Sequence, residues 1–308
     1  MGKYEDEIIL QERRMENLLC DLVKLIPFFE TKTITDIFVY SQGNVRVRDF
    51  DKGDYDSGVI LSVPERLRII YSLSSVVNVP IDKWVRPTLE SIIPKYNIRT
   101  TAILDPWLAA PELTFRRPAD KVHTFNDYLA EGRITGELRD KIISHIENYS
   151  NIVISGSTGS GKTTFTNACL DKMYELAPQD RLYIVEDTFE LQCPSPWKTQ
   201  LYIRPDQAVA AIQTAMRWTP RRIIFGEIRY GEVANEMLKA WITGHPGITT
   251  IHADSAASTI PRIEGLLREV IKGQIPDLSD SIHLIVHLKN KCVTEALTVR
   301  EIREGKQM

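Results

Sequence analysis

The spacing of apolar residues in the first third of the chain predicts a mixture of helices and short strands. Apolar residues recur with helical spacing from Tyr4 to Leu25 and again from Pro64 to Val77. Between them, Asp36 to Phe50 alternates between apolar and polar residues around a glycine, which predicts a β-hairpin. The segment from Pro80 to Pro118 is interrupted by prolines and predicts short strands and loops. We therefore expect a smaller α+β domain over residues 1–120.

The pattern changes in the rest of the chain, where short apolar runs alternate with segments of helical periodicity. The predicted strands are Ile152–Ser155, Arg181–Val185, Arg222–Phe225 and Ile248–His252. The predicted helices lie around Ile134–Ile146, from Lys162, over Asp206–Trp218 and after Gly231. This alternation is typical of an α/β domain with a mostly parallel sheet covered on both faces. We expect that domain to span residues 121–308.

Composition narrows the class of protein. The chain has 308 residues, of which 43% are hydrophobic and 26% charged, with a net charge of −3. This charge does not favour a surface built as a whole to hold nucleic acid. The chain contains no apolar run near the roughly 18 to 20 residues that cross a bilayer, so we expect no membrane-spanning helix. Cys20, Cys169, Cys193 and Cys292 form no C-x-x-C pair, which fits reduced thiols in the cytoplasm.

The segment SGSTGSGKTT, Ser155 to Thr164, contains the pattern G-x-x-x-x-G-K-[ST] between a predicted strand and a predicted helix. Glycines allow successive N–H groups to surround a phosphate at a helix N-terminus, where the dipole favours an anion. Lys162 would reach the β- and γ-phosphates, and the Thr163 hydroxyl would ligate Mg²⁺. A simple glycine turn with a solvated lysine does not account for Lys-Thr at the helix start. The expected nucleotide-binding residues are Gly156, Ser157, Thr158, Gly159, Ser160, Gly161, Lys162, Thr163 and Thr164.

Three further predicted strands end in polar residues. Glu227 ends an apolar strand and is our first choice for a group that orients a water molecule for attack on phosphate. Glu186 and Glu190 follow another strand, and their spacing alone fits either a role near Mg²⁺ or the capping of a helix. His252 ends a third strand, and a lone histidine is more often a structural hydrogen-bond donor than a catalytic group.

Taken in order, GSTGSGKTT, IVEDTFEL, RRIIFGEIRYGEVANEMLKAWITGHPG and TTIHADSA resemble the Walker A, Asp box, Walker B and His box of the secretion ATPases that drive type II and type IV secretion and pilus machines. Upstream, ITDIFVYSQGNVRV and TFRRPADKVHTFNDYL are similar to the N-terminal hairpin and the arginine-containing linker of that family. The short N-terminal half and the absence of a tetracysteine zinc module are most similar to the conjugative, TrbB-type ATPases of type IV secretion.

The resemblance implies a role for each matching residue. Glu227 would be the Walker B carboxylate that orients the attacking water, and Glu186 and Glu190 would assist at the metal and the water. His252 would sense the γ-phosphate. Arg116 and Arg117 would reach the nucleotide from the N-terminal domain, although alone they fit a solvated basic turn before Pro118. Arg217 and Arg229 match further family arginines, and salt bridges to acids such as Glu232 are an equal alternative for them.

The resemblance also implies a RecA-like P-loop NTPase domain at the C-terminus, with the N-terminal domain covering the nucleotide and contacting a neighbouring subunit. The implied assembly is a homo-hexamer that hydrolyses ATP with Mg²⁺ and couples hydrolysis to domain motion. Its implied partners are inner-membrane proteins of the secretion complex, including other ATPases of the machine. The expected location is the cytoplasm, peripheral to the inner face of the inner membrane.

Other functions fit parts of the same pattern. A pilus-retraction motor of the same superfamily would share the chemistry and differ in its partners. A nucleotide-gated scaffold would bind ATP without hydrolysing it, but such a protein has no need of Glu227 at its strand end. A motor acting on DNA strands predicts a basic aromatic channel, and the isolated Lys and Arg residues here form no such run, so we expect no direct binding of nucleic acid.

Overall fold

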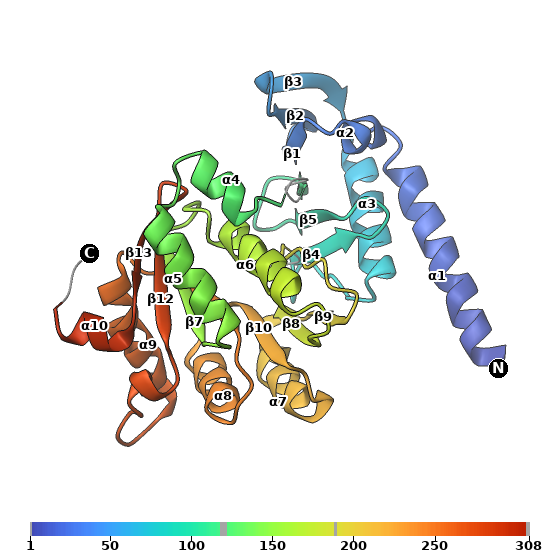
Figure 1. Cartoon of the computed structure of the whole chain (residues 1–308). Helices are drawn as coiled ribbons and strands as arrows, with labels where there is room; N and C mark the ends of the chain where they lie inside the picture. The colour runs from blue at the N-terminus through green and yellow to red at the C-terminus, as the bar shows by residue number, and fades with distance from the viewer. Residues whose placement is uncertain (1, 118–121, 188–189, 306–308) are drawn as a thin grey trace. The chain divides into compact units, whose positions relative to one another are not determined.

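A computed structural model describes residues 2–117, 122–187 and 190–305, and the chain forms two compact units, Met1–Asp120 and Lys121–Met308 (Figure 1). The expected domain boundary, between residues 120 and 121, lies outside the described residues. Among the helices of these described ranges, none is both long and apolar enough to span a bilayer.

The N-terminal unit is built on a six-stranded antiparallel sheet with the strand order β3-β2-β1-β6-β5-β4. Its elements are α1 (Gly2–Asp21), α2 (Ile26–Glu30), β1 (Ile34–Val39), β2 (Asn44–Asp49), β3 (Gly53–Ile60), α3 (Val63–Val76), β4 (Thr88–Ile93), β5 (Ile98–Ile103) and β6 (Glu112–Arg116). Figure 1 shows α1 and α3 side by side. The predicted hairpin is confirmed as β1 and β2. In β2 the side chains of Val45 and Val47 lie in the core, and those of Arg46 and Arg48, which alternate with them, lie at the surface.

The first helix differs from the prediction at its C-terminal end. The expected helix from Tyr4 to Leu25 is wrong beyond Asp21, where α1 ends, and a separate helix, α2, begins at Ile26. Pro27 lies in the first turn of α2, where proline is tolerated because that N–H has no partner inside the helix. Within a longer helix the same proline would remove a hydrogen bond and clash with the preceding turn.

The C-terminal unit contains a seven-stranded sheet with the strand order β13-β12-β7-β11-β10-β8-β9, in which only β12 and β13 pair in antiparallel fashion. Its strands are β7 (Ile152–Gly156), β8 (Leu182–Glu186), β9 (Lys198–Tyr202), β10 (Arg222–Glu227), β11 (Ile248–Ile251), β12 (Leu284–Lys289) and β13 (Cys292–Leu297). Its α-helices are α4 (Phe125–Ala130), α5 (Gly136–Glu147), α6 (Lys162–Leu176), α7 (Ala208–Trp218), α8 (Gly231–Ile242), α9 (Ala256–Val270) and α10 (Val299–Arg303). The predicted strands and the mostly parallel sheet are confirmed.

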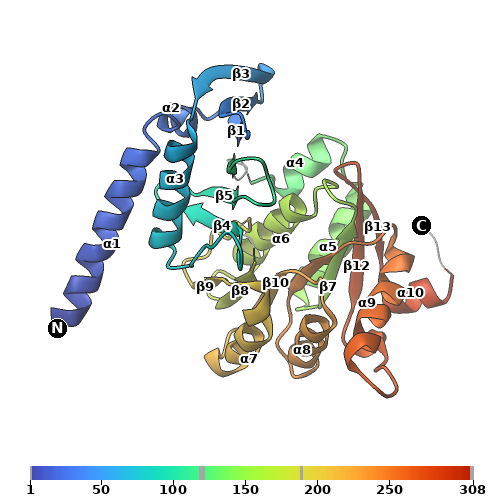
Figure 2. The same ribbon diagram turned by 180° about the vertical axis from the view of Figure 1, so that it is seen from behind.

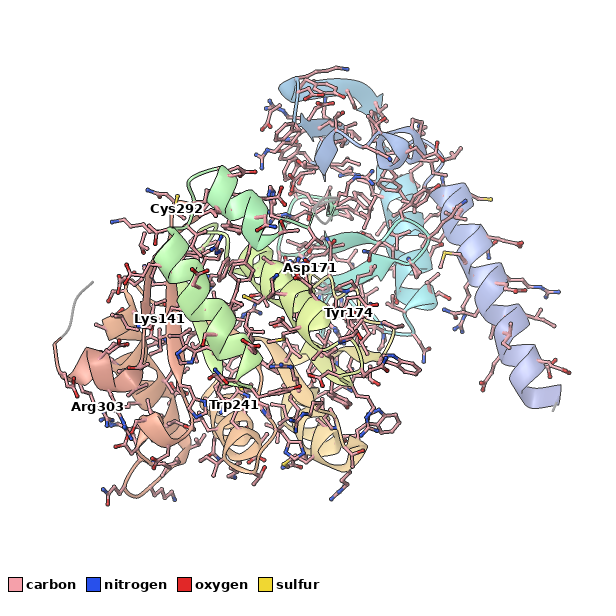
Figure 3. The ribbon with its side chains drawn as sticks, in the orientation of Figure 1. Lys141, Asp171, Tyr174, Trp241, Cys292 and Arg303 are labelled. Atoms are coloured by element: carbon pink, nitrogen blue, oxygen red, sulfur yellow. The ribbon has the colours of Figure 1, made fainter. Side chains whose placement is uncertain are left out.

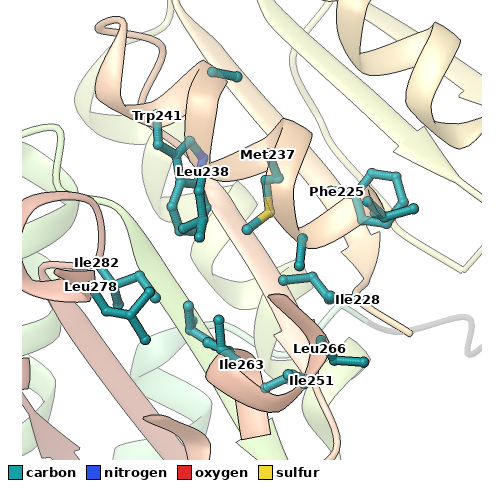
Figure 4. Close-up of a cluster of buried hydrophobic side chains, with 14 of the residues drawn as sticks. Phe225, Ile228, Met237, Leu238, Trp241, Ile251, Ile263, Leu266, Leu278 and Ile282 are labelled. Carbon is teal, nitrogen blue, oxygen red and sulfur yellow. The ribbon is translucent and has the colours of Figure 1, made fainter. Parts of the chain in front are cut away.

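Helices cover both faces of this sheet, as Figures 1 and 2 show from opposite sides. Ile152 and Ile154 pack with α4, α5 and α6, whereas Val153 packs on the other face with α7, α8 and α9. Figure 4 shows part of the second cluster, to which α8 contributes Met237 and Trp241 and α9 contributes Ile263. At the surface, Lys141 of α5, labelled in Figure 3, forms an ion pair of 2.9 Å with Glu301 of α10.

Gly247, just before β11, provides a test of how closely the parallel strands pack. A Cβ on this residue would lie 1.6 Å from the carbonyl oxygen of Ile223 in β10. We expect Gly247→Ala to lower the free energy of unfolding by about 3 kcal/mol or more, because two backbones would have to separate. Calorimetric or denaturant unfolding of the full chain measures this change.

Gly265→Ala is the matched control, since a Cβ on this residue of α9 would meet no atom within 4 Å. It should raise stability by roughly 0.5 to 1 kcal/mol through helix propensity. Equal stability of the two variants would contradict this account of the sheet.

Candidate functional site

Residues 157–160 connect β7 to α6 in a turn that requires glycine at both of its ends. A Cβ on Gly156 would lie 2.4 Å from Ser160 Oγ and 2.6 Å from the carbonyl oxygen of Leu288. Gly161, which precedes α6, has a left-handed φ of +95°. The first N–H groups of a helix have no partner within it, and the helix dipole adds positive potential there. The local sequence therefore folds into a site suited to an anion.

The Lys162 side chain folds back over this loop. Its ammonium donates hydrogen bonds to the carbonyl oxygens of Gly156, at 2.9 Å, and Ser157, at 3.0 Å. It also lies 3.2 Å from Nδ1 of His252. Burial lowers the pKa of Lys162, and the nearby Glu227 carboxylate acts in the opposite direction. The lysine is thus held inside the loop that surrounds the anion site.

Glu227 ends β10 between a histidine and an arginine. Its Oε1 lies 2.7 Å from Nε2 of His252, and its Oε2 accepts a hydrogen bond of 2.9 Å from Nε of Arg229. His252 follows β11, which lies between β7 and β10 in the sheet, so the ring reaches Lys162 and Glu227 at once. Because an ammonium group can only donate, Nδ1 of His252 is the acceptor in its contact with Lys162.

Arg229 extends this network to the end of a neighbouring strand. Its guanidinium forms an ion pair of 2.5 Å with Asp187, which directly follows β8, in addition to its contact with Glu227. The ion pairs anticipated for Arg229 therefore exist, with Glu227 and Asp187 as partners in place of Glu232. Arg217, the other arginine singled out in the sequence, lies exposed near the end of α7.

Glu186 and Glu190 occupy different environments although they belong to one motif. Glu186 is buried, and its Oε1 accepts hydrogen bonds from the N–H groups of Glu190 and Leu191, at 2.9 and 2.7 Å. Burial raises the pKa of Glu186 to about 7, although these bonds and one from Gln200 oppose the shift. Glu190 instead accepts a hydrogen bond of 3.1 Å from the Thr163 hydroxyl. Glu186 thus shapes the backbone that brings Glu190 to the start of α6.

Two residues that the sequence did not single out support this arrangement. Gln200, on β9, donates to Oε2 of Glu186 and to the carbonyl oxygen of Leu191, both at 2.8 Å. Asn167 donates to the carbonyl oxygen of Glu190 and accepts from the N–H of Gln192. Asn167 lies four residues after Thr163, so helical spacing places both residues on the same face of the helix and could have indicated a role for Asn167 beside Thr163. Gln200 gave no such signal, because only the pairing of β8 with β9 brings it near.

The two arginines of the N-terminal unit make different contacts within that unit. Arg116 ends β6 with 69% of its side chain exposed, and its nearest acid, Asp36, is 3.6 Å away. Arg117 directs its guanidinium onto backbone carbonyl oxygens, with contacts to Ile34 at 3.1 Å and to Phe29. Arg116 therefore has a side chain available for another partner, whereas Arg117 stabilises its own unit.

In the C-terminal unit, direct contacts join Lys162, His252 and Glu227 in one set and Thr163 and Glu190 in another, at the adjacent start of α6. The remaining predicted phosphate-contacting residues lie at the end of β7, in the connecting loop and in the first turn of α6: Gly156, Ser157, Thr158, Gly159, Ser160, Gly161 and Thr164. Among the described residues, no group of three His, Cys, Asp or Glu side chains could hold a metal ion.

Comparison with known proteins adds the evolutionary context. A family model described as Type II/IV secretion system protein matches residues 88–305. Conjugal transfer protein TrbB of Rhizobium radiobacter is 32% identical over 300 residues, which cover 95% of this chain and 91% of the relative. A probable conjugal transfer protein TrbB of Sinorhizobium fredii strain NBRC 101917 / NGR234 is 32% identical over 281 residues, covering 88% and 84% of the two chains.

Two solved structures share the fold. The ATPase DotB of Legionella pneumophila has a TM-score of 0.67 at 22% identity, covering 92% of this chain and 82% of its own. The pilus retraction motor PilT with bound ADP has a TM-score of 0.66 at 17% identity, covering 92% and 86%. The α/β architecture with a RecA-like C-terminal domain and a smaller α+β N-terminal domain is thereby confirmed.

The raised pKa of Glu186 predicts how this residue links stability to pH. The folded chain keeps a proton on Glu186 that the unfolded chain, with its ordinary pKa of 4.5, releases. The contribution to stability is therefore complete below about pH 4.5 and is lost as the pH rises through 7. Replacing Glu186 by Gln removes this titration, so the stability of the native sequence relative to Glu186→Gln should fall by about 2 to 3 kcal/mol over that range.

Urea unfolding of both proteins at several pH values between 4 and 8 measures the difference. Parallel curves with a constant offset would show that the pKa of Glu186 is the same in the folded and unfolded chains, in conflict with this environment.

Proposed function

The chain belongs to the type II/IV secretion system protein family, and from this membership we propose that it is an ATP hydrolase that powers a type IV secretion or conjugation machine. The membership confirms the resemblance found in the sequence. The observation that carries the proposed hydrolysis is the direct chain of contacts from Lys162 through His252 to Glu227. It links the predicted phosphate loop to the carboxylate that would orient water.

Each side chain has a role in the proposed reaction. Lys162 neutralises charge on the β- and γ-phosphates, and the N–H groups at the start of α6 bind the β-phosphate. Glu227 orients the attacking water. His252 senses whether the γ-phosphate is present, and its contact with Glu227 couples this to the position of the carboxylate. Hydrolysis then depends on electrostatic stabilisation and positioning more than on covalent chemistry by the protein.

Magnesium would be held mainly by the nucleotide. Mg²⁺ commonly keeps several waters and takes one or two protein oxygens together with phosphate oxygens. The Thr163 hydroxyl supplies such an oxygen, and the Glu190 carboxylate lies 3.1 Å from it. Glu186 acts as a positioning residue through its bonds to the N–H groups of Glu190 and Leu191.

The proposed motor is a homo-hexamer in which the N-terminal domain covers the nucleotide and contacts a neighbouring subunit. Arg116 supplies positive charge to the transferring phosphate, since its exposed side chain is available for a partner beyond its own unit. Closure of the two domains would complete the site, and hydrolysis would allow the domains to open again. The chemical step would thereby be coupled to rigid-body motion. The motor would act at the cytoplasmic face of the inner membrane with other proteins of the secretion complex.

Two variants separate nucleotide binding from hydrolysis. Lys162→Ala should weaken ATP binding at least about 100-fold, because the β- and γ-phosphates lose their lysine. Glu227→Gln should bind ATP but hydrolyse it about 100 to 1,000 times more slowly, because the amide cannot accept the proton of the attacking water. A fluorescent-nucleotide titration and a phosphate-release assay measure the two effects. Hydrolysis by Glu227→Gln at the native rate would overturn the proposed function, and equally slow hydrolysis by the native protein would indicate a nucleotide-gated scaffold.

The two neighbouring arginines should behave in opposite ways. Arg116→Ala should lower ATP hydrolysis about 100-fold or more with little change in stability, because the arginine is largely exposed and lies 3.6 Å from Asp36. Arg117→Ala should lower the free energy of unfolding by about 1 to 2 kcal/mol, because several carbonyl oxygens lose their donor.

Both variants can be compared in one set of ATPase and thermal-unfolding measurements. Native hydrolysis by Arg116→Ala, or loss of hydrolysis by Arg117→Ala at native stability, would reverse these assignments.

A further inference from the structure

A hairpin outside the recognised motifs presents a lysine in an unfavourable backbone conformation. Asn290 and Lys291 join β12 to β13, and their φ angles are +50° and +65°. Two-residue turns of this kind favour Asn-Gly, because the second position is left-handed and a side chain there is strained. Such strained positions cluster at functional sites. Lys291 thus occupies a position where glycine would be the better local choice.

This hairpin is joined to the phosphate loop by backbone contacts. The N–H of Lys291 donates a hydrogen bond of 3.0 Å to the carbonyl oxygen of Ser160. A Cβ built on Gly161 would lie 3.5 Å from Cα and 3.8 Å from Cβ of Lys291. Cys292, labelled in Figure 3, marks where β13 begins directly after this lysine. The root of the Lys291 side chain is therefore beside the N-terminus of α6.

The charge of Lys291 has no partner in the part of the chain that the structure describes. Its side chain is exposed, and within residues 2–117, 122–187 and 190–305 its ammonium makes neither a hydrogen bond nor an ion pair. Lys162 instead turns toward His252, which follows β11. Because β7 lies between β11 and β12, His252 after β11 and Lys291 after β12 lie on opposite sides of the strand that leads into the loop. A lysine whose backbone lies beside an anion site and whose ammonium is carried on a flexible aliphatic chain is suited to pair with a phosphate oxygen.

We propose that Lys291 is a second lysine of the phosphate site and pairs its ammonium with non-bridging oxygens of the diphosphate that ADP and ATP share. This inference rests on the proposed nucleotide binding. A contact to the shared diphosphate stabilises substrate, transition state and product alike. Its loss therefore raises KM for ATP and Kd for ADP by the same factor and leaves kcat unchanged.

The test compares Lys291→Met, which removes the charge and keeps the length, with Lys291→Arg, which keeps the charge. Lys289→Met is the matched control, since Lys289 is an exposed lysine of the same hairpin. Titration with ADP and steady-state ATP hydrolysis should show affinity about threefold to tenfold weaker in Lys291→Met. Lys291→Arg should stay within about twofold of the native protein, and Lys289→Met should match it. Native affinity in Lys291→Met, or a change in kcat alone, would overturn the inference.

The same titration of the native protein and Lys162→Ala separates this inference from the function on which it rests. If the native protein binds ADP, Lys162→Ala does not, and Lys291→Met binds like the native protein, only the role of Lys291 fails. If the native protein binds neither ADP nor ATP, both proposals fail.

A third variant distinguishes the charge of Lys291 from the shape of the turn. Lys291→Gly relieves the left-handed strain and keeps the backbone N–H that binds Ser160. We expect its thermal midpoint to be equal to that of the native protein or about 1 to 2 °C higher, while ADP affinity falls as in Lys291→Met. Weaker binding accompanied by a lower midpoint would assign the effect to the turn and overturn the role of the ammonium.

Discussion

Parallel pairing of β7, β11, β10 and β8 is the constraint on which the candidate site depends. In a parallel sheet the carboxyl ends of all strands lie at one edge, which is where ligands bind in open α/β folds. Here these ends deliver Gly156, His252, Glu227 and Glu186 to the same edge, although 96 residues separate the first from the second along the chain. The contacts of Lys162, His252 and Glu227 follow from this register.

Close backbone packing holds the strands of this sheet together, near the amino ends of β10 and β11 at Gly247 and at the carboxyl end of β7 at Gly156. Gly247 leaves no space for a side chain against β10, and Gly156 leaves none against the carbonyl oxygen of Leu288 in β12. Of the two strands that flank β7, β12 therefore packs closely against the start of the phosphate loop. His252 follows β11 on one side of β7, and Lys291 follows β12 on the other, so the loop lies between two strands that are each followed by a polar residue.

Sequence reasoning was most successful where an apolar strand is followed directly by a functional residue. The phosphate loop, Glu227 and His252 all follow this pattern, and the structure joins them in one network. The pattern gave no guide to β9, whose residues are polar or half-exposed and pair only with β8. Gln200 was missed for that reason. The sequence also predicted the same role for Arg116 and Arg117. The structure shows that the guanidinium of Arg117 instead donates hydrogen bonds to backbone carbonyl oxygens of its own unit.

The central claim is that this chain hydrolyses ATP as an assembled motor. The most direct test is the rate of Mg²⁺-dependent ATP hydrolysis per subunit over a wide range of protein concentration, with Glu227→Gln as the control. The account predicts a rate that rises with concentration, reaches a plateau and is lost in the variant, because the proposed motor is active only when assembled. A rate that stays at the level of the variant at every concentration, while ATP remains bound, would contradict it.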